Sequence, residues 1–101
     1  MDKDFFIKNK DGIYPVIEKA AALLKSAGAD GVYLFGSTTE GTRRSDSDID
    51  LAVEGLPPEI FYQVVGMLLL ELPCSIDLVD LDQELPFTRY LKQKGKLIRV
   101  A

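Results

Sequence analysis

Three aspartates stand at positions where their carboxylates can converge. Asp48 and Asp50 alternate with apolar residues in the segment 48–53, a pattern typical of a β-strand with one covered face. Side chains two apart in a strand point to the same face, so these two carboxylates are expected side by side, away from the core. Asp77 alternates with apolar neighbours in the later segment 75–79 in the same way, and it can join that open face.

Carboxylates held this close together favour a divalent cation between them. Without a cation they repel each other, and the pKa of one of them rises. Ligands that are all oxygen favour Mg²⁺ or Mn²⁺ over zinc. The other aspartate pairs with the same spacing lie outside such a strand and are interpreted as turns or helix caps. Asp80 would fall on the core face if its strand continued, so it is interpreted as a strand-end or capping residue.

A second group of residues suits an anion. Gly36 and Ser37 end an apolar segment and begin a polar one. A glycine there lets the backbone approach a phosphate closely, and the N–H groups of a helix beginning at Ser37 would point at it. Arg43 and Arg44 follow in the same polar segment, where a solvated basic pair and a pair of phosphate contacts are both open interpretations. The sequence therefore suggests phosphate binding beside the predicted metal site.

Composition excludes several kinds of chemistry. The 101 residues include no histidine, so catalysis by a histidine base and histidine-ligated zinc are excluded within this chain. A single cysteine, Cys74, excludes an internal disulfide. The net charge of −4 does not match a nucleic-acid-binding surface. The longest apolar stretch is too short to span a membrane and the N-terminus is unlike a signal peptide, so a cytoplasmic protein is expected.

Apolar periodicity predicts the elements that position these groups. Helices are expected at 13–27, at 60–72 and from Asp80 or Asp82 to about 94, and the polar segment 37–44 can start with a short helix. Strands are expected at 31–36, 48–53, 75–79 and 96–100. This order predicts an α/β (α+β) fold with a small mixed sheet and helices mainly on one face. One domain over residues 1–101 is expected, with 1–10 as a frayed lead. The chain has no length for a large second substrate domain.

The combination of motifs is more specific than its parts. Gly36-Ser37 is followed by ten residues and then by Asp48-x-Asp50, within the stretch FGSTTEGTRRSDSDIDLAV. This resembles the motif G-S-x(10)-D-x-D of the DNA polymerase beta-type nucleotidyltransferase superfamily. Within that superfamily it looks most like the minimal nucleotidyltransferases, the MNT group. The resemblance extends from about residue 13 to 100 and includes the closing segments SIDLVDLD and RYLKQKGKLIRV.

The resemblance implies a reaction and roles for these residues. A nucleoside monophosphate, AMP from ATP, would pass to an acceptor hydroxyl with release of pyrophosphate. Asp48 and Asp50 would hold two Mg²⁺ ions, with Mn²⁺ as the other candidate metal, and Asp77 would ligate one ion and accept the proton of the acceptor. Gly36 and Ser37 would bind the β- and γ-phosphates. Arg44 matches an arginine common in the family, and Arg43 beside it is a second candidate for nucleotide binding.

The resemblance also implies a protein partner. Minimal members are typically paired with a helical ribonuclease toxin of the HEPN family, which they neutralise, some by transferring AMP to a toxin tyrosine. Two alternatives stay open. Thr38 and Glu40 stand where many minimal members carry arginines, which suits a module of weak activity that neutralises its partner by binding alone. Transfer to a small molecule, as in aminoglycoside nucleotidyltransferases, is the other. The acceptor, the base and the oligomeric state, a homo-oligomer included, stay open.

Overall fold

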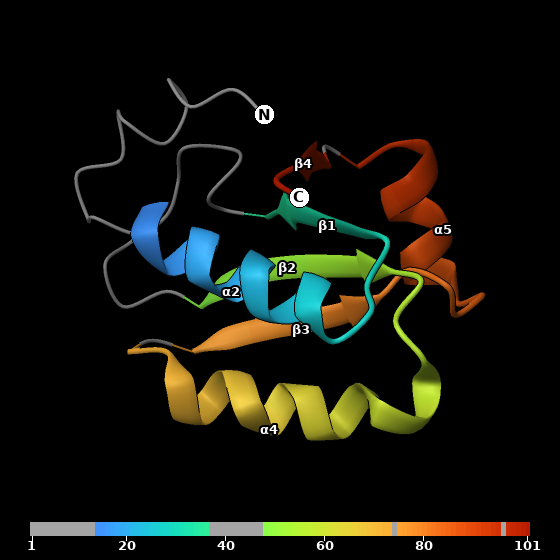
Figure 1. Cartoon of the computed structure of the whole chain (residues 1–101). Coiled ribbons are helices and arrows are strands. Elements are labelled where there is room, and N and C mark those ends of the chain that lie inside the picture. The colour runs from blue at the N-terminus through green and yellow to red at the C-terminus, as the bar shows by residue number, and fades with distance from the viewer. Residues whose placement is uncertain (1–13, 37–47, 74, 96) are drawn as a thin grey trace.

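The computed structural model describes residues 14–36, 48–73, 75–95 and 97–101 (Figure 1). In chain order the elements are α2 (Tyr14–Ser26), β1 (Gly31–Phe35), β2 (Ile49–Glu54), a 3-10 helix (Pro58–Ile60), α4 (Phe61–Glu71), β3 (Ile76–Asp80), α5 (Pro86–Gln93) and β4 (Ile98–Arg99). Within these residues, no helix has the length and apolar character needed to cross a membrane. The predicted alternation of helices and strands is confirmed over the described part of the chain.

The four strands form one mixed sheet in the order β3-β2-β1-β4. β1 pairs antiparallel with both β2 and β4, whereas β2 and β3 run parallel. Parallel neighbours need a crossover connection, and α4 supplies it between β2 and β3. The registers place Phe35 opposite Asp50, and Asp50 opposite Asp77, so three neighbouring strands carry these residues in one row.

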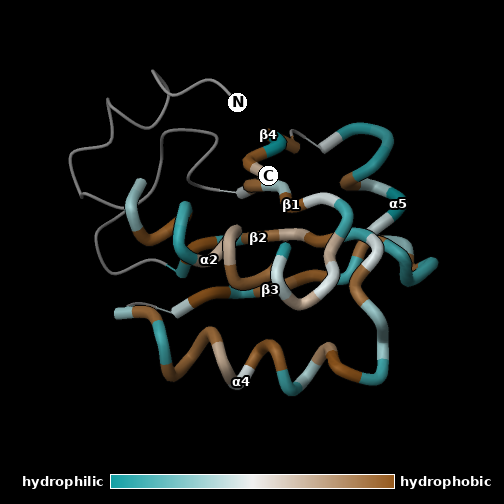
Figure 2. Tube along the Cα trace, viewed as in Figure 1, coloured by the Kyte–Doolittle hydropathy of each residue, from teal (hydrophilic) through white to brown (hydrophobic). Residues whose placement is uncertain are grey.

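Helices α2 and α4 cover one face of the sheet (Figure 1). Their apolar side chains pack on alternate residues of the strands, and Figure 2 shows hydrophobic residues along most of β2 and β3. The fully buried members of this core include Ile17, Leu24, Leu34, Ile49 and Leu51. Helix α5 packs on the other face through Leu91, which joins Phe35, Ala52 and Leu81 in a smaller cluster. The expectation of helices mainly on one face is confirmed.

The start of the last helix differs from the prediction. Asp80 and Asp82 do not cap it, because their carboxylates hold the preceding turn. Asp80 accepts a hydrogen bond from the backbone N–H of Asp82 at 3.0 Å, and Asp82 accepts one from the N–H of Gly55 at 2.7 Å. Asp80 is therefore the strand-end residue that the alternation predicted. Helix α5 begins instead at Pro86, whose fixed φ suits a first helical position.

The start of α5 is held by the hydroxyl group of Thr88. This residue is only 2% exposed, and its Oγ1 accepts the N–H of Leu85 at 3.0 Å and lies within bonding reach of the carbonyl of Gln83. Thr88→Val keeps the shape but removes the buried hydroxyl that bonds to these backbone groups, so the free energy of unfolding should fall by about 1–3 kcal/mol in urea titrations. Thr88→Ser, which keeps the hydroxyl, is the control. Equal stability of Thr88→Val and the wild type would contradict the role given to the hydroxyl.

Candidate active site

The three aspartates of the predicted site lie near the same end of the sheet, and two of them are paired. Asp50 on β2 and Asp77 on β3 are direct register partners, and Asp48 immediately precedes β2. Ile49 and Leu51 are fully buried under α2 and α4, so the alternation of the strand turns Asp50 to the opposite face, where α5 packs. Asp50 is half-buried, while Asp48 and Asp77 are exposed. The predicted convergence of Asp50 and Asp77 on one face follows from this register.

The charges of these aspartates act on one another. Burial raises the pKa of Asp50 above its usual value, and the negative charges of Asp77 and Asp48 raise it further. The ion pairs between described residues lie elsewhere, between Lys19 and Glu71 on α2 and α4 and between Arg89 and Glu84 near α5. Within the described part of the chain, therefore, the acids have no ion-paired lysine or arginine. A cation bound between them would relieve the repulsion.

The donor set can be tested against a divalent metal. No three His, Cys, Asp or Glu side chains among the described residues are gathered closely enough to hold an ion by themselves. The chemistry of the donors nevertheless fits, because Asp50 and Asp77 are adjacent carboxylates that repel each other and Asp48 adds to that repulsion. Mg²⁺ is commonly bound by one or two carboxylates and completed by water and substrate phosphates. This acidic site suits that mode of binding better than a closed cage of protein ligands.

Gly36 brings the backbone at the end of β1 against Asp50. Its φ of +77° lies in the left-handed region, which costs a residue with a side chain about 1–2 kcal/mol. A Cβ placed on Gly36 would lie 3.0 Å from Cγ and 3.2 Å from Cβ of Asp50. Both the conformation and the contact therefore require glycine. Gly36, the first residue of the Gly-Ser motif, therefore lies against Asp50, and its role in phosphate binding stays a prediction.

The rest of the predicted phosphate-binding segment lies outside the described residues. This applies to Ser37, Arg43 and Arg44, to the short helix expected at the start of the polar segment, and to Thr38 and Glu40. Their roles stay predictions from the sequence.

The structure adds an aromatic pair that the sequence did not single out. Phe35, the register partner of Asp50, meets Phe87 of α5 edge to face, with ring centroids 6.1 Å apart and an interplanar angle of 62°. Phe35 is nearly buried, whereas Phe87 keeps half of its surface exposed. No sequence signal connects them, because Phe35 belongs to an ordinary apolar strand and the two lie 52 positions apart in the chain.

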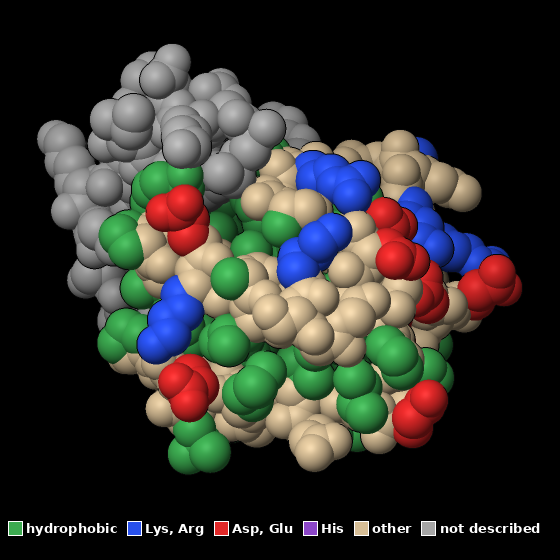
Figure 3. Space-filling view, viewed as in Figure 1, with side chains coloured by type: hydrophobic (Ala, Val, Ile, Leu, Met, Phe, Trp, Pro, Cys, Tyr) green, Lys and Arg blue, Asp and Glu red, His purple; other side chains and the backbone are tan. Residues whose placement is uncertain are grey.

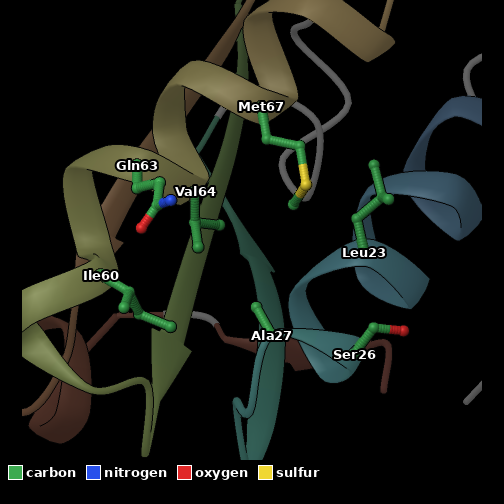
Figure 4. Close-up of a pocket in the computed structure, with 7 residues that line it drawn as sticks. All are labelled: Leu23, Ser26, Ala27, Ile60, Gln63, Val64 and Met67. Carbon is green, nitrogen blue, oxygen red and sulfur yellow. The ribbon is translucent and has the colours of Figure 1, made fainter.

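A separate groove lies on the other side of the sheet, between α2 and α4 (Figure 4). Its volume is about 410 Å³, and its lining carries no ionisable side chain: Leu23, Ser26, Ala27, Ile60, Gln63, Val64 and Met67. Nearby on α4, the side chains of Tyr62 and Leu70 are 83% and 89% exposed. Figure 3 shows hydrophobic side chains along the edge of the molecule where α4 lies. These features offer apolar contact surface, but the sheet separates them from the acids.

Comparisons with known proteins agree with the geometry. Residues 18–100 match the family model described as polymerase beta, nucleotidyltransferase. A crystal structure of a toxin–antitoxin with AMP-PNP is similar with a TM-score of 0.63 and 30% identity, over 79% of this chain and 70% of that one. Two structures of the toxin–antitoxin MntA-HpeT are also similar. One carries glutamates in place of two aspartates two positions apart (TM-score 0.61, 28% identity, 78% of this chain and 68% of that one). The other carries alanine in place of a tyrosine (TM-score 0.61, 30% identity, 81% of this chain and 70% of that one). Comparison with curated proteins gives no match.

Proposed function

Because the chain belongs to the polymerase beta-type nucleotidyltransferases, in their minimal, antitoxin-like group, we propose that it transfers AMP from ATP to a hydroxyl group of a protein partner. The observation that carries this proposal is the row formed by Asp50 and Asp77, with Gly36 packed against Asp50. It places concentrated negative charge beside a backbone that can approach a phosphate. Such a site suits a metal-bound polyphosphate.

The similar structures support the substrate and the acids. One of them was solved with AMP-PNP, an ATP analogue. In another, the two replaced aspartates have the same spacing as Asp48 and Asp50 in this chain. This supports Asp48 and Asp50 as members of the active site, beside Asp77.

Each of these residues then has its own role in the proposed reaction. Asp48, Asp50 and Asp77 would hold divalent Mg²⁺, which would neutralise triphosphate charge and lower the pKa of the acceptor hydroxyl. Gly36 lets the backbone approach the phosphates closely beside Asp50. A carboxylate oxygen of Asp77 takes the proton from the acceptor hydroxyl, and the oxygen of that hydroxyl then forms a bond to the α-phosphorus. The bond from the α-phosphorus to the bridging oxygen breaks, and pyrophosphate leaves with the electron pair.

The acceptor is proposed to lie on a toxin partner. Each of the similar structures described above is a toxin–antitoxin. A helical HEPN-type toxin that receives AMP on a tyrosine, with this chain as the antitoxin, fits the family resemblance. A tyrosine hydroxyl has an ordinary pKa near 10, so deprotonation beside a metal-bound carboxylate is chemically reasonable.

A second candidate function is neutralisation by binding alone. It is favoured by the exposed apolar side chains Tyr62 and Leu70 of α4, which offer contact surface to a partner. Under this alternative the aspartates are dispensable and complex formation is sufficient.

Label transfer separates the two functions. The chain is incubated with α-labelled ATP, Mg²⁺ and the product of the neighbouring gene, and the label on the partner is measured. Transfer that disappears with a chelator and with Asp77→Asn supports the enzyme. Asp80→Asn is the matched control, because Asp80 lies on the same strand but holds a turn, so the folded variant should still transfer label. Tight complex formation without label, unchanged by Asp77→Asn, would instead support binding alone.

A further inference from the structure

We propose that Phe87, resting on Phe35, is the surface on which the base of the nucleotide substrate stacks. The proposal rests on the proposed function, since it assigns the base-binding part of the same site. It concerns the ligand end remote from the phosphates, for which the sequence offered no candidate residue. The geometry of three strands and α5 carries it.

The acids and the aromatic pair lie in one row across the sheet. Asp77, Asp50 and Phe35 are successive register partners on β3, β2 and β1, so their side chains emerge on the same face. Phe35 confirms that face by packing with Ala52 and with Leu91 of α5. Partners on adjacent strands lie about 5 Å apart between Cα atoms. The aromatic pair therefore lies directly beside the acidic site, on the same face of the sheet.

Phe87 is oriented to receive a planar ligand. Its ring meets Phe35 edge to face, which fixes the side chain while leaving half of it exposed. The anchoring of α5 by the buried Thr88 and Leu91 places Phe87 on a rigid element. Leu85 and Tyr90 are also about half exposed, so the apolar surface continues around the start of the helix. An ordinary core contact would have buried Phe87 as Phe35 is buried.

A nucleotide matches this arrangement end for end. Its phosphates need a cation, which the carboxylates would hold, and its base is a flat ring that stacks on aromatic side chains. In the nucleotide, the ribose lies between the phosphates and the base. In the protein, Phe35 lies between the acids and Phe87: it is the register partner of Asp50, and its ring centroid is 6.1 Å from that of Phe87. Neither phenylalanine has a hydrogen-bonding side chain. The surface should therefore bind purines better than pyrimidines by stacking area, with little discrimination between adenine and guanine.

Fluorescence tests the stacking directly. The probe is 2-aminopurine riboside triphosphate with Mg²⁺, whose emission is quenched when its base stacks on an aromatic ring, and the full chain contains no tryptophan to interfere. Inorganic tripolyphosphate, which lacks a base, is measured by competition. Phe87→Leu keeps an apolar side chain against Phe35 but removes the aromatic surface. Phe87→Leu should weaken probe binding about 10-fold and abolish quenching, with tripolyphosphate affinity unchanged. Phe87→Trp should restore both the probe affinity and the quenching.

Controls separate stacking from folding. Tyr62→Ala removes an even more exposed aromatic ring from a different helix, α4, and should leave probe binding unchanged. Wild-type affinity and quenching in Phe87→Leu would overturn the proposal, as would an equal loss of probe and tripolyphosphate. Loss of partner binding with nucleotide binding intact would assign the surface to the protein partner and also overturn it. Probe binding that needs Asp50 but not Phe87 would leave the proposed function standing, whereas no triphosphate binding at all would overturn both.

Discussion

Asp50→Asn is expected to reduce nucleotidyl transfer by about 10³-fold or more and yet to leave the fold at least as stable at neutral pH. The loss of activity follows from removing a central charge that binds the metal, since about 4 kcal/mol of lost transition-state stabilisation corresponds to that factor. The gain in stability follows from the raised pKa of Asp50, which burial and two neighbouring carboxylates produce. Asparagine keeps the size and removes the repulsion.

The raised pKa of Asp50 determines how the stability of Asp50→Asn relative to wild type changes with pH. A carboxyl group whose pKa is higher in the folded state than in the unfolded state destabilises the fold once it ionises. That penalty is absent below the unfolded pKa, near 3.8, and grows as the pH rises through the folded pKa. In chelator, the stability of Asp50→Asn relative to wild type should therefore increase from pH 3.5 upward and then level off. Urea titrations at several pH values measure it.

Magnesium should reverse the comparison. Binding to the folded state alone stabilises it, so the wild type should gain stability in Mg²⁺ while Asp50→Asn gains much less. A variant that is less stable than wild type throughout the pH range in chelator would contradict the assigned electrostatics. Equal stabilisation of both proteins by Mg²⁺ would contradict Asp50 as a ligand.

Gly36→Ala is expected to damage both the fold and the reaction. Alanine at a φ of +77° costs about 1–2 kcal/mol, and its Cβ presses on the Asp50 side chain from 3.0 Å. Unfolding free energy should fall by at least that amount. Activity of the folded fraction should fall further, because displacement of a carboxylate by even a fraction of an ångström disturbs metal and phosphate positions.

Gly66→Ala is the matched control for that variant. Gly66 lies inside α4, and a Cβ there would meet no atom within 4 Å. Alanine should stabilise this helix by about 0.5–1 kcal/mol and leave transfer unchanged. If both alanine variants behave alike in urea titrations and label transfer, the close contact between Gly36 and Asp50 is not what requires glycine.

The sequence predicted the parts of the site that depend on local alternation. Asp50 and Asp77 could be assigned to one open face because a strand with buried neighbours leaves no other direction for them. The pairing of β2 with β3 in parallel, which makes these residues direct partners, is a tertiary outcome that alternation alone does not determine. For the same reason the sequence located the strands to within one or two residues but did not reveal their order.

Long-range contacts account for the features that the sequence missed. The assignment of Asp80 or Asp82 as a helix cap was wrong because a capping aspartate and a turn aspartate look alike in sequence. What decides between them is the N–H of Gly55, which bonds to Asp82 across 27 positions. The contact between Phe35 and Phe87 likewise depends on where α5 returns to the sheet.

The acidic pair forms only when β3 pairs with β2 in the observed register, so activity depends on correct assembly of the sheet. If β3 slipped by one residue against β2, Ile76 and Leu78 would turn to water, and Asp77 would be forced among the apolar side chains beneath α4. The register can shift only by whole residues, so no partial shift would keep the apolar side chains buried and the acids paired. Insertions and deletions should consequently be tolerated in the link between α4 and β3 but not within the strand, and a misassembled copy would expose apolar side chains at the same moment as it lost its acidic pair.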